Sequence, residues 1–191
     1  SLFSSIYVVF LCTLLCVAPV CAGLERFYGF EHFDDDKTLT SQSIVSAAQD
    51  KNGFMWFGTE DNGVFRYDGV EFKQYKHLSN DEHSIAAGRV YSILADSRGL
   101  LWFATVGGGV SQYNPDTDQF KTFRHDPKNM QSLGHNVVRS LMEDQHGNIW
   151  LGTTIGISIF NPLLQTFSHI EVAPGALSGG DIWHLFQGRD N

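Results

Sequence analysis

After residue 42 the chain alternates short apolar runs with small groups of Gly, Asp, Asn and Pro. Short runs rich in β-branched and aromatic side chains, bounded by such turn residues, predict β-strands. The middle of the chain shows the pattern most fully, with runs at 89–95, 100–105, 110–113 and 119–123. An Asp-x-x-Gly turn at 96–99 joins the first two runs, so this stretch is predicted to form four short antiparallel strands.

The four-strand unit occurs three times. Each copy carries the phrase Asp-x-x-Gly-x-x-Trp, whose Trp falls at 56, 102 and 150, so the copies are 46 and 48 residues apart. A repeat of roughly 40 to 50 residues is typical of arrays of identical supersecondary units. The first copy predicts strands at 44–49, 54–59, 64–67 and 71–75, and the third at 138–143, 148–153, 156–160 and 166–170.

Three residue types recur at fixed positions of the unit: an Asp that begins the first turn, a Gly that ends it, and a Trp in the second strand. Asp accepts hydrogen bonds from the turn backbone, and Gly takes a positive φ without steric cost. We interpret the Trp side chains as packing one unit against the next, and all three residue types as structural rather than catalytic. They are Asp50, Gly53, Trp56, Asp96, Gly99, Trp102, Asp144, Gly147 and Trp150.

Four-stranded antiparallel units repeated at this period predict an all-β protein, a β-propeller whose blades pack side by side about an axis. We place blade 1 at 43–87, blade 2 at 88–134, blade 3 at 135–177 and the start of a fourth blade at 178–191. Residues 23–42 are expected to contain an N-terminal strand that completes the last blade. The chain would therefore be an incomplete propeller of three full blades and parts of a fourth.

Two stretches need a decision between alternatives. Apolar residues between 133 and 142 have helical spacing, and Ser132 is a candidate helix cap, so this stretch taken alone favours a helix. The equivalent positions of the other units are strand-like, and we therefore predict a strand at 138–143. In the fourth unit, 181–186 is predicted as the first strand.

The N-terminus has the features of a leader. The first 24 residues carry no charge, and 6–21 is an apolar run that is shorter than the roughly 20 residues of a membrane span. The run ends in Val-Cys-Ala, small residues suited to signal peptidase, so 1–22 is predicted to be a signal peptide cleaved after Ala22. An uncleaved anchor is the alternative. Because there is no initiator Met and no basic leader residue, we expect that residue 1 is not the natural start and that the sequence is a fragment.

Charge and cysteine content limit the partners. Cys12, Cys16 and Cys21 all lie in the leader, so residues 23–191 must be held together by packing rather than by disulfides. The net charge of −8 belongs entirely to the exported part. Nucleic acids and anionic lipids select basic surfaces, so neither is expected as a partner.

The full phrase is Val-x-Ser-Ile/Leu-x-x-Asp-x-x-Gly-x-x-Trp-Phe/Leu-Gly-Thr, followed by Gly-Val-x-x-Tyr and Phe-x-x-Phe/Tyr. Over roughly residues 27–191 it resembles the two-component regulator propeller repeat. That resemblance implies a bacterial receptor whose propeller faces the periplasm at the inner membrane and binds a ligand, often an oligosaccharide. It further implies additional C-terminal blades and a membrane-tethered histidine kinase or diguanylate cyclase. A homodimer is a further expectation.

Recognition residues are sought where the units differ. In a propeller, the loops that enter the innermost strands and those that join strands two and three gather around the central channel. One position beside these loops differs from unit to unit, and we call it the variable slot. Its residues are Val45, Tyr91, Arg139 and Trp183. Aromatic, Arg and carboxylate side chains suit a small polar ligand or oligosaccharide, although these positions could also be unconstrained surface. The candidate ligand-binding residues are Arg89, Tyr91, Arg139, Trp183, Glu60 and Asp61.

Catalytic signatures are not apparent in the sequence. It contains no Gly-x-Ser-x-Gly elbow and no phosphate-binding loop, and its eight histidines lack tight ligand spacing. We therefore expect no cofactor, no metal and no enzyme activity in this segment. The leading interpretation is the ligand-sensing domain of a signalling receptor. The alternatives are a secreted propeller that acts only as a protein-interaction scaffold, and a propeller lyase with its active site in further blades.

Overall fold

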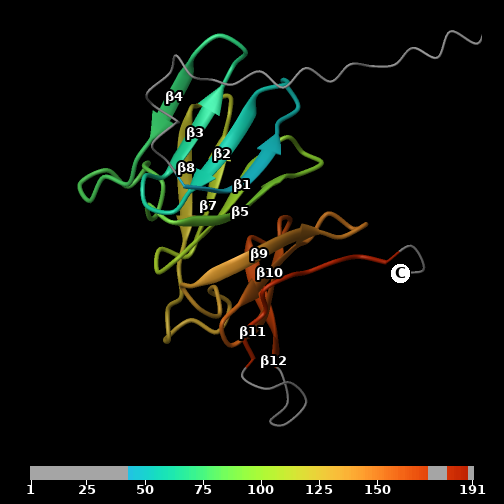
Figure 1. The fold of residues 1–191 in the computed structure, drawn as a ribbon. Coiled ribbons are helices and arrows are strands. Elements are labelled where there is room, and N and C mark those ends of the chain that lie inside the picture. Colours follow the sequence, from blue (N-terminus) through green and yellow to red (C-terminus); the bar gives the residue numbers. More distant parts are fainter. Residues whose placement is uncertain (1–42, 172–179, 189–191) are drawn as a thin grey trace, which may run out of the picture. The chain divides into compact units, whose positions relative to one another are not determined.

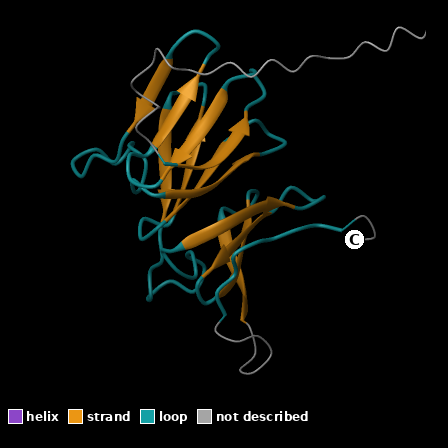
Figure 2. Ribbon diagram, in the orientation of Figure 1, coloured by secondary structure: helices purple, strands orange, loops and turns teal. Residues whose placement is uncertain are grey.

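The structure is a computed structural model that describes residues 43–171 and 180–188. All described residues belong to one compact unit. Their regular structure consists of strands alone (Figure 2). No helix long and apolar enough to cross a bilayer occurs among these residues. The predicted signal peptide and N-terminal strand lie outside the described residues.

Three four-stranded antiparallel sheets follow one another along the chain (Figure 1). The first contains β1 (Ile44–Gln49), β2 (Met55–Thr59), β3 (Val64–Tyr67) and β4 (Phe72–Tyr75). The second contains β5 (Val90–Ala95), β6 (Leu101–Thr105), β7 (Val110–Asn114) and β8 (Gln119–Phe123). The third contains β9 (Val138–Glu143), β10 (Ile149–Thr153), β11 (Gly156–Asn161) and β12 (Thr166–Glu171). Each sheet keeps the sequence order of its strands.

The twelve strands confirm the all-β fold and the three-unit pattern, with bounds within one residue of those predicted. The strand predicted at 138–143, in preference to a helix, is confirmed, because β9 pairs with β10. The predicted first strand of a fourth unit is not formed, since residues 180–188 have no regular structure. An innermost strand forms its ladder with the second strand of its own blade, and no such partner exists among the described residues.

The three sheets pack as propeller blades through their innermost strands, with β5 in contact with both β1 and β9. Hydrogen bonds cross between blades at this level. The Ser46 hydroxyl donates to the Val90 carbonyl at 3.3 Å, and the Gly63 N–H donates to the Gly88 carbonyl at 2.8 Å. The spacing between blades 1 and 2 is therefore set by backbone as well as by side chains.

The repeated Asp joins the first turn of each blade to its core. In blade 1, Asp50 Oδ1 accepts from the backbone N–H groups of Asn52 and Phe54 at 2.9 and 3.0 Å. Its second oxygen accepts from the Trp56 indole N–H at 2.9 Å. Asp96 and Asp144 bind Trp102 and Trp150 in the same way, at 3.0 and 2.9 Å. The glycine that closes each turn has a positive φ, 89° at Gly53, 83° at Gly99 and 76° at Gly147.

Trp56 and Trp102, held in this way, pack at the boundary with the next blade. Trp56 stacks on Tyr75 of its own blade, with ring centroids 5.4 Å apart, and meets Tyr113 of blade 2 at 4.8 Å. Trp102 repeats the arrangement with Phe123 and Phe160, at 5.8 and 5.1 Å. Trp56 and Trp102 are fully buried, so these aromatic contacts form the core between blades.

The boundary between blades 1 and 2 also contains a polar bridge. Asp118 Oδ1 accepts from the hydroxyls of Tyr75 and Tyr113, each at 2.7 Å, and Oδ2 pairs with Lys73 at 2.5 Å. Burial acts to raise the pKa of Asp118, but these three donors lower it to about 2. At the next boundary the tyrosine positions are Phe123 and Phe160, and no equivalent carboxylate is present.

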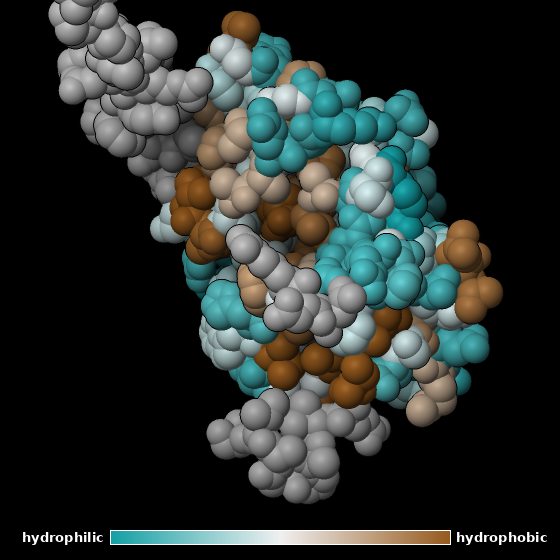
Figure 3. All heavy atoms as spheres, turned by 90° about the vertical axis from the view of Figure 1, so that its right-hand side faces the viewer, coloured by the Kyte–Doolittle hydropathy of each residue, from teal (hydrophilic) through white to brown (hydrophobic). Residues whose placement is uncertain are grey.

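The loops that connect the blades protect the outer strand edges. The Phe120 N–H of β8 donates to the His83 carbonyl at 3.0 Å, and the Phe167 N–H of β12 donates to the Gln131 carbonyl at 2.9 Å. Exposed strand edges invite pairing with other chains, and these loops reduce that exposure. On the face drawn in Figure 3, hydrophobic surface occurs as separate patches between hydrophilic areas.

Replacement of Gly58 by alanine tests the close approach of blades 1 and 2. A Cβ at this position would lie 2.3 Å from Ser46 Oγ and 2.9 Å from the Val90 carbonyl oxygen. Because the carbonyl belongs to the backbone of the next blade, Gly58→Ala should cost about 1–3 kcal/mol of unfolding free energy, as measured by urea denaturation. The reverse change at the equivalent position of blade 2, Ala104→Gly, creates no clash and should cost less. A Gly58→Ala variant as stable as wild type would contradict this account of the boundary.

Acid titration tests the Asp–Trp bond. Burial by itself would raise the pKa of Asp144, but hydrogen bonds from the Asn148 side chain, the Trp150 indole and backbone N–H groups lower it to about 2. Ionised Asp144 therefore stabilises the fold above about pH 4, and this stabilisation is lost as the pH falls through 2. We expect Asp144→Asn to be less stable than wild type by about 1–2 kcal/mol at pH 6 after allowance for solvent screening, and the difference to shrink towards pH 2. A difference that stays constant over this range would show that ionisation of Asp144 is unimportant.

Candidate ligand-binding site

The predicted site residues lie at one end of the blades. Here the β2–β3 turn, at 60–63, meets the chain that enters the innermost strands. The Glu60 N–H donates to the Ser43 carbonyl at 3.0 Å, and the Val106 N–H donates to the Arg89 carbonyl at 3.1 Å. We call this the entry end, and the opposite end, with the Asp-x-x-Gly turns, the turn end.

The variable slot coincides with a β-bulge in each innermost strand. In blade 1 the register shifts between Ile44 and Ser46, which leaves Val45 as the extra residue. The shift in blade 2 leaves Tyr91, and the shift in blade 3 leaves Arg139, because Val138 and Ser140 pair with consecutive residues of β10. A bulge bends the strand and redirects the side chain of its unpaired residue. The slot is therefore a position where side chains are presented away from the regular ladder.

Three of the predicted residues form one cluster. The Arg139 guanidinium carbon lies 3.9 Å from the ring centre of Trp183 and 5.5 Å from that of Tyr91. The two rings are 6.1 Å apart. Arg139 Nε donates to Asp181 Oδ1 at 2.7 Å, and this bond raises the pKa of the guanidinium further above its ordinary value. Cation–π stacking and a charged hydrogen bond thus fix the Arg139 side chain in one orientation.

The cluster draws on consecutive blades and on the segment that follows them. Tyr91 comes from β5 and Arg139 from β9, while Asp181 and Trp183 come from residues 180–188. This segment lies beside β10, because the Ile182 N–H donates to the Thr153 carbonyl at 2.9 Å. Ile182 thus meets blade 3 as Val90 meets blade 1, since a Cβ on Gly152 or on Gly58 would approach the carbonyl of Ile182 or of Val90 equally closely.

The remaining predicted residues form a second group. Arg89 makes an ion pair with the Glu60 carboxylate and donates from Nε to the Glu60 backbone carbonyl at 3.2 Å. Both side chains are more than a third exposed, and Asp61 beside them is also exposed. No contact between this pair and the Arg139 cluster is present among the described residues, so the six predicted residues form two groups rather than one.

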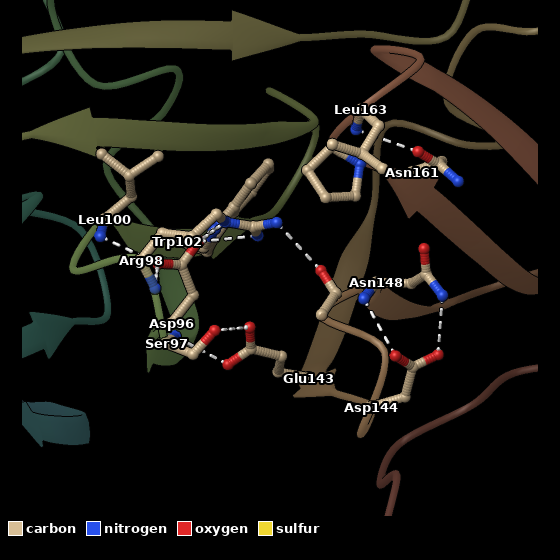
Figure 4. Close-up of polar contacts among 12 residues, drawn as sticks. Asp96, Ser97, Arg98, Leu100, Trp102, Glu143, Asp144, Asn148, Asn161 and Leu163 are labelled. Carbon is tan, nitrogen blue, oxygen red and sulfur yellow. Dashed lines mark hydrogen bonds and ion pairs between the residues drawn. The ribbon is translucent and has the colours of Figure 1, made fainter.

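The turn end carries a polar network that the sequence did not reveal (Figure 4). Ser97 donates from its backbone N–H and from its hydroxyl to the two oxygens of Glu143 of the next blade, each at 2.7 Å. Arg98 binds Asp96 through Nε and Nη2 and reaches the Gly147 carbonyl through Nη1 at 3.0 Å. These contacts connect the turns of blades 2 and 3. The equivalent residues of blade 1 differ in type, so no repeated signal marks the network.

Metal binding finds no support in the described part of the chain, where no group of three or more His, Cys, Asp or Glu side chains could hold an ion. His77 and His125 occupy equivalent loops, and each places Nδ1 2.8 Å from a backbone carbonyl, that of Ile85 or Leu133. Because a carbonyl oxygen only accepts, Nδ1 must be the protonated nitrogen in both rings. The two histidines therefore stabilise the conformation of the loops that connect the blades.

Residues 38–61, 84–107 and 132–154 each match the family model of the two component regulator propeller. The chain belongs to the two-component regulator propeller repeat family. The matched segments cover the Asp-x-x-Gly-x-x-Trp phrase and the innermost strand of each blade, so the family is recognised by the same residues that build the repeated turn and core. No curated protein matches the chain.

Solved structures agree with this assignment. The extracellular domain assigned to a hybrid two-component system of B. thetaiotaomicron is 28% identical over 75% of this chain, with a TM-score of 0.68. A second extracellular domain from the same organism, assigned to a one-component system, is 22% identical over 78% of the chain, with a TM-score of 0.64. The chain spans about a fifth of the length of each, 20% and 21%.

A more distant structure shows the fold alone. A catalytically inactive virginiamycin B lyase from Staphylococcus aureus is 13% identical over 71% of this chain and 43% of its own length, with a TM-score of 0.55. The propeller architecture is thus shared well beyond the repeat family. Family and first neighbour together support a sensor-domain role for the chain.

Proposed function

We propose that this chain belongs to the extracytoplasmic ligand-sensing domain of a bacterial signalling receptor and that it recognises its ligand at the entry end. The observation that carries the proposal is the meeting of Tyr91 and Arg139, the bulge residues of blades 2 and 3, with Trp183 of the segment that follows blade 3. A propeller built only for packing has no need of a stacked Arg at its least regular position. Trp183 remains 53% exposed, so part of its ring can receive a ligand.

The chemistry of the cluster suits a small polar ligand or an oligosaccharide. An exposed indole offers a flat apolar surface against which a sugar ring can lie. The Arg139 guanidinium has five N–H donors and uses Nε in its bond to Asp181, so it has further donors that suit hydroxyl or acidic groups of a ligand. Arg89 and Glu60 add a second polar group at the same end of the blades.

The cellular setting is part of the same proposal. The apolar leader and the likeness to extracellular domains of signalling systems support export and a place on the periplasmic side of the inner membrane. The output would be a histidine kinase or a diguanylate cyclase reached through a transmembrane helix. Enzyme activity would reside in that output, and this segment would act by binding alone.

Binding of defined trisaccharides tests the site. We expect the full-length protein to bind a neutral probe, maltotriose, or an acidic probe, trigalacturonate, in calorimetric titrations. Trp183→Ala and Arg139→Ala should each weaken binding at least about tenfold without lowering expression, because both remove a rigid part of the cluster.

Val70→Ser is the matched control, since Val70 is 89% exposed in a turn at the opposite end and should not affect binding. A protein that binds neither probe, or binds them equally well after Arg139→Ala, would not be a saccharide sensor at this site and would favour the scaffold alternative.

A further inference from the structure

The Arg139 side chain already holds a carboxylate. Its Nε lies 2.7 Å from Asp181 Oδ1, and only 16% of the Arg139 side chain is exposed. The guanidinium stacks on Trp183 two residues further along the same segment. Residues 180–188 therefore contact Arg139 through both a charge and a ring.

The segment has few other attachments. Strands β5 and β9 are each held by a ladder of backbone pairs to the neighbouring strand of their own blade. Residues 180–188 form no ladder, and their one backbone hydrogen bond among the described residues runs from Ile182 to Thr153. Ile182, whose carbonyl packs closely against Gly152, and the side chains around Arg139 together hold this segment on blade 3.

The carboxylate of Asp181 differs from the other acids that pair with an Arg. The Asp96 side chain is fully buried, and besides Arg98 it binds the Trp102 indole and the backbone of its turn. Asp181 is 33% exposed, and among the described residues its carboxylate accepts a hydrogen bond only from Arg139. Replacing Asp181 therefore breaks a single charged hydrogen bond, whereas replacing Asp96 would break the turn.

The remaining Arg pair is a poorer receptor for an anion. Arg89 is 43% exposed, and it also binds the backbone carbonyl of its partner Glu60 at 3.2 Å. No aromatic ring stacks on it among the described residues. Among the described Arg residues that pair with a carboxylate, Arg139 alone combines two flanking rings with a partly exposed partner.

We infer that Asp181 is a built-in competitor at Arg139, and that a ligand carboxylate binds by taking its place. The inference rests on the proposed function and deepens it, since it names an acidic ligand, such as a uronic acid residue, and a consequence of its binding. When Asp181 is displaced, residues 180–188 lose their charged contact with blade 3. Ligand binding is thereby linked to the position of the segment that follows blade 3.

The competition predicts whether ligand affinity rises or falls when Asp181 is replaced. A ligand that must displace an internal group binds more weakly than it would to the free site, in proportion to the fraction of time that the site is open. Removal of the competing charge should therefore strengthen acidic ligand binding. If Asp181 instead only positioned Arg139, the same change would weaken binding, so the two roles predict opposite results.

Asp181→Asn tests the competition in the full-length protein. The amide keeps the shape and can still accept a hydrogen bond, but it lacks the charge. We expect it to tighten trigalacturonate binding about threefold to tenfold, in line with a partly exposed ion pair, and not to tighten maltotriose binding. Asp116→Asn is the control, because it removes one exposed charge from the β7–β8 turn at the other end of the blades.

Fluorescence follows the segment directly. Trp56 and Trp102 are fully buried, whereas Trp183 is half exposed and stacked on Arg139. Trigalacturonate should change the emission of wild type and have much less effect on Trp183→Phe. An acidic ligand that binds Arg139 and leaves the Trp183 signal unchanged would contradict the release of the segment.

The outcomes separate this inference from the proposed function. Unchanged or weaker trigalacturonate binding by Asp181→Asn, or an equal gain in Asp116→Asn, overturns the competition. Binding of maltotriose alone, sensitive to Arg139→Ala, overturns it as well but leaves the sensor proposal standing. Binding of neither trisaccharide removes the proposed function itself.

Discussion

The hydrogen bond from a Trp indole to a turn carboxylate is the interaction on which the rest of this structure depends. Trp56 and Trp102 are fully buried, and a buried indole N–H requires an acceptor. Asp50 supplies one with its second oxygen while its first oxygen holds the turn. One side chain thus closes the first turn of the blade and orients the ring that packs on the next blade. Because the same geometry recurs at Asp96 and Asp144, successive blades take equivalent positions.

The positions fixed by the Asp–Trp bond are the same in successive blades, and other positions vary. The Asp–Trp bond and the turn that it closes repeat in each blade, whereas the ring partners at the boundaries change from Tyr75 and Tyr113 to Phe123 and Phe160. Variation is greatest at the bulge of the innermost strand, where an apolar, an aromatic and a charged side chain occupy one slot. A bulge residue lies outside the ladder, so its side chain can change without disturbing backbone pairing.

The strands, the turns and the structural role of the repeated Asp, Gly and Trp could be read from the sequence because each depends on local chemistry repeated three times. The bulges could not, since no residue type marks Val45, Tyr91 and Arg139 as unpaired. Nor could the division of the candidate site into two groups, because the partners of Arg139 and Arg89 are fixed by the packing of blades. The strand expected at 181–186 failed for a related reason: its sequence matches the repeat, but its ladder partner is not among the described residues.

Under the proposed function, the same reasoning explains how recognition and signalling would share one place in this fold. A propeller blade is rigid where its ladder and its Asp–Trp bond are complete, and a rigid blade transmits a local change poorly. Residues 180–188 meet blade 3 through one backbone hydrogen bond and through the side chains around Arg139. A ligand bound at the bulge slot as proposed would therefore act on residues 180–188. Its binding energy would alter the contacts of that segment rather than the packing that maintains the blades.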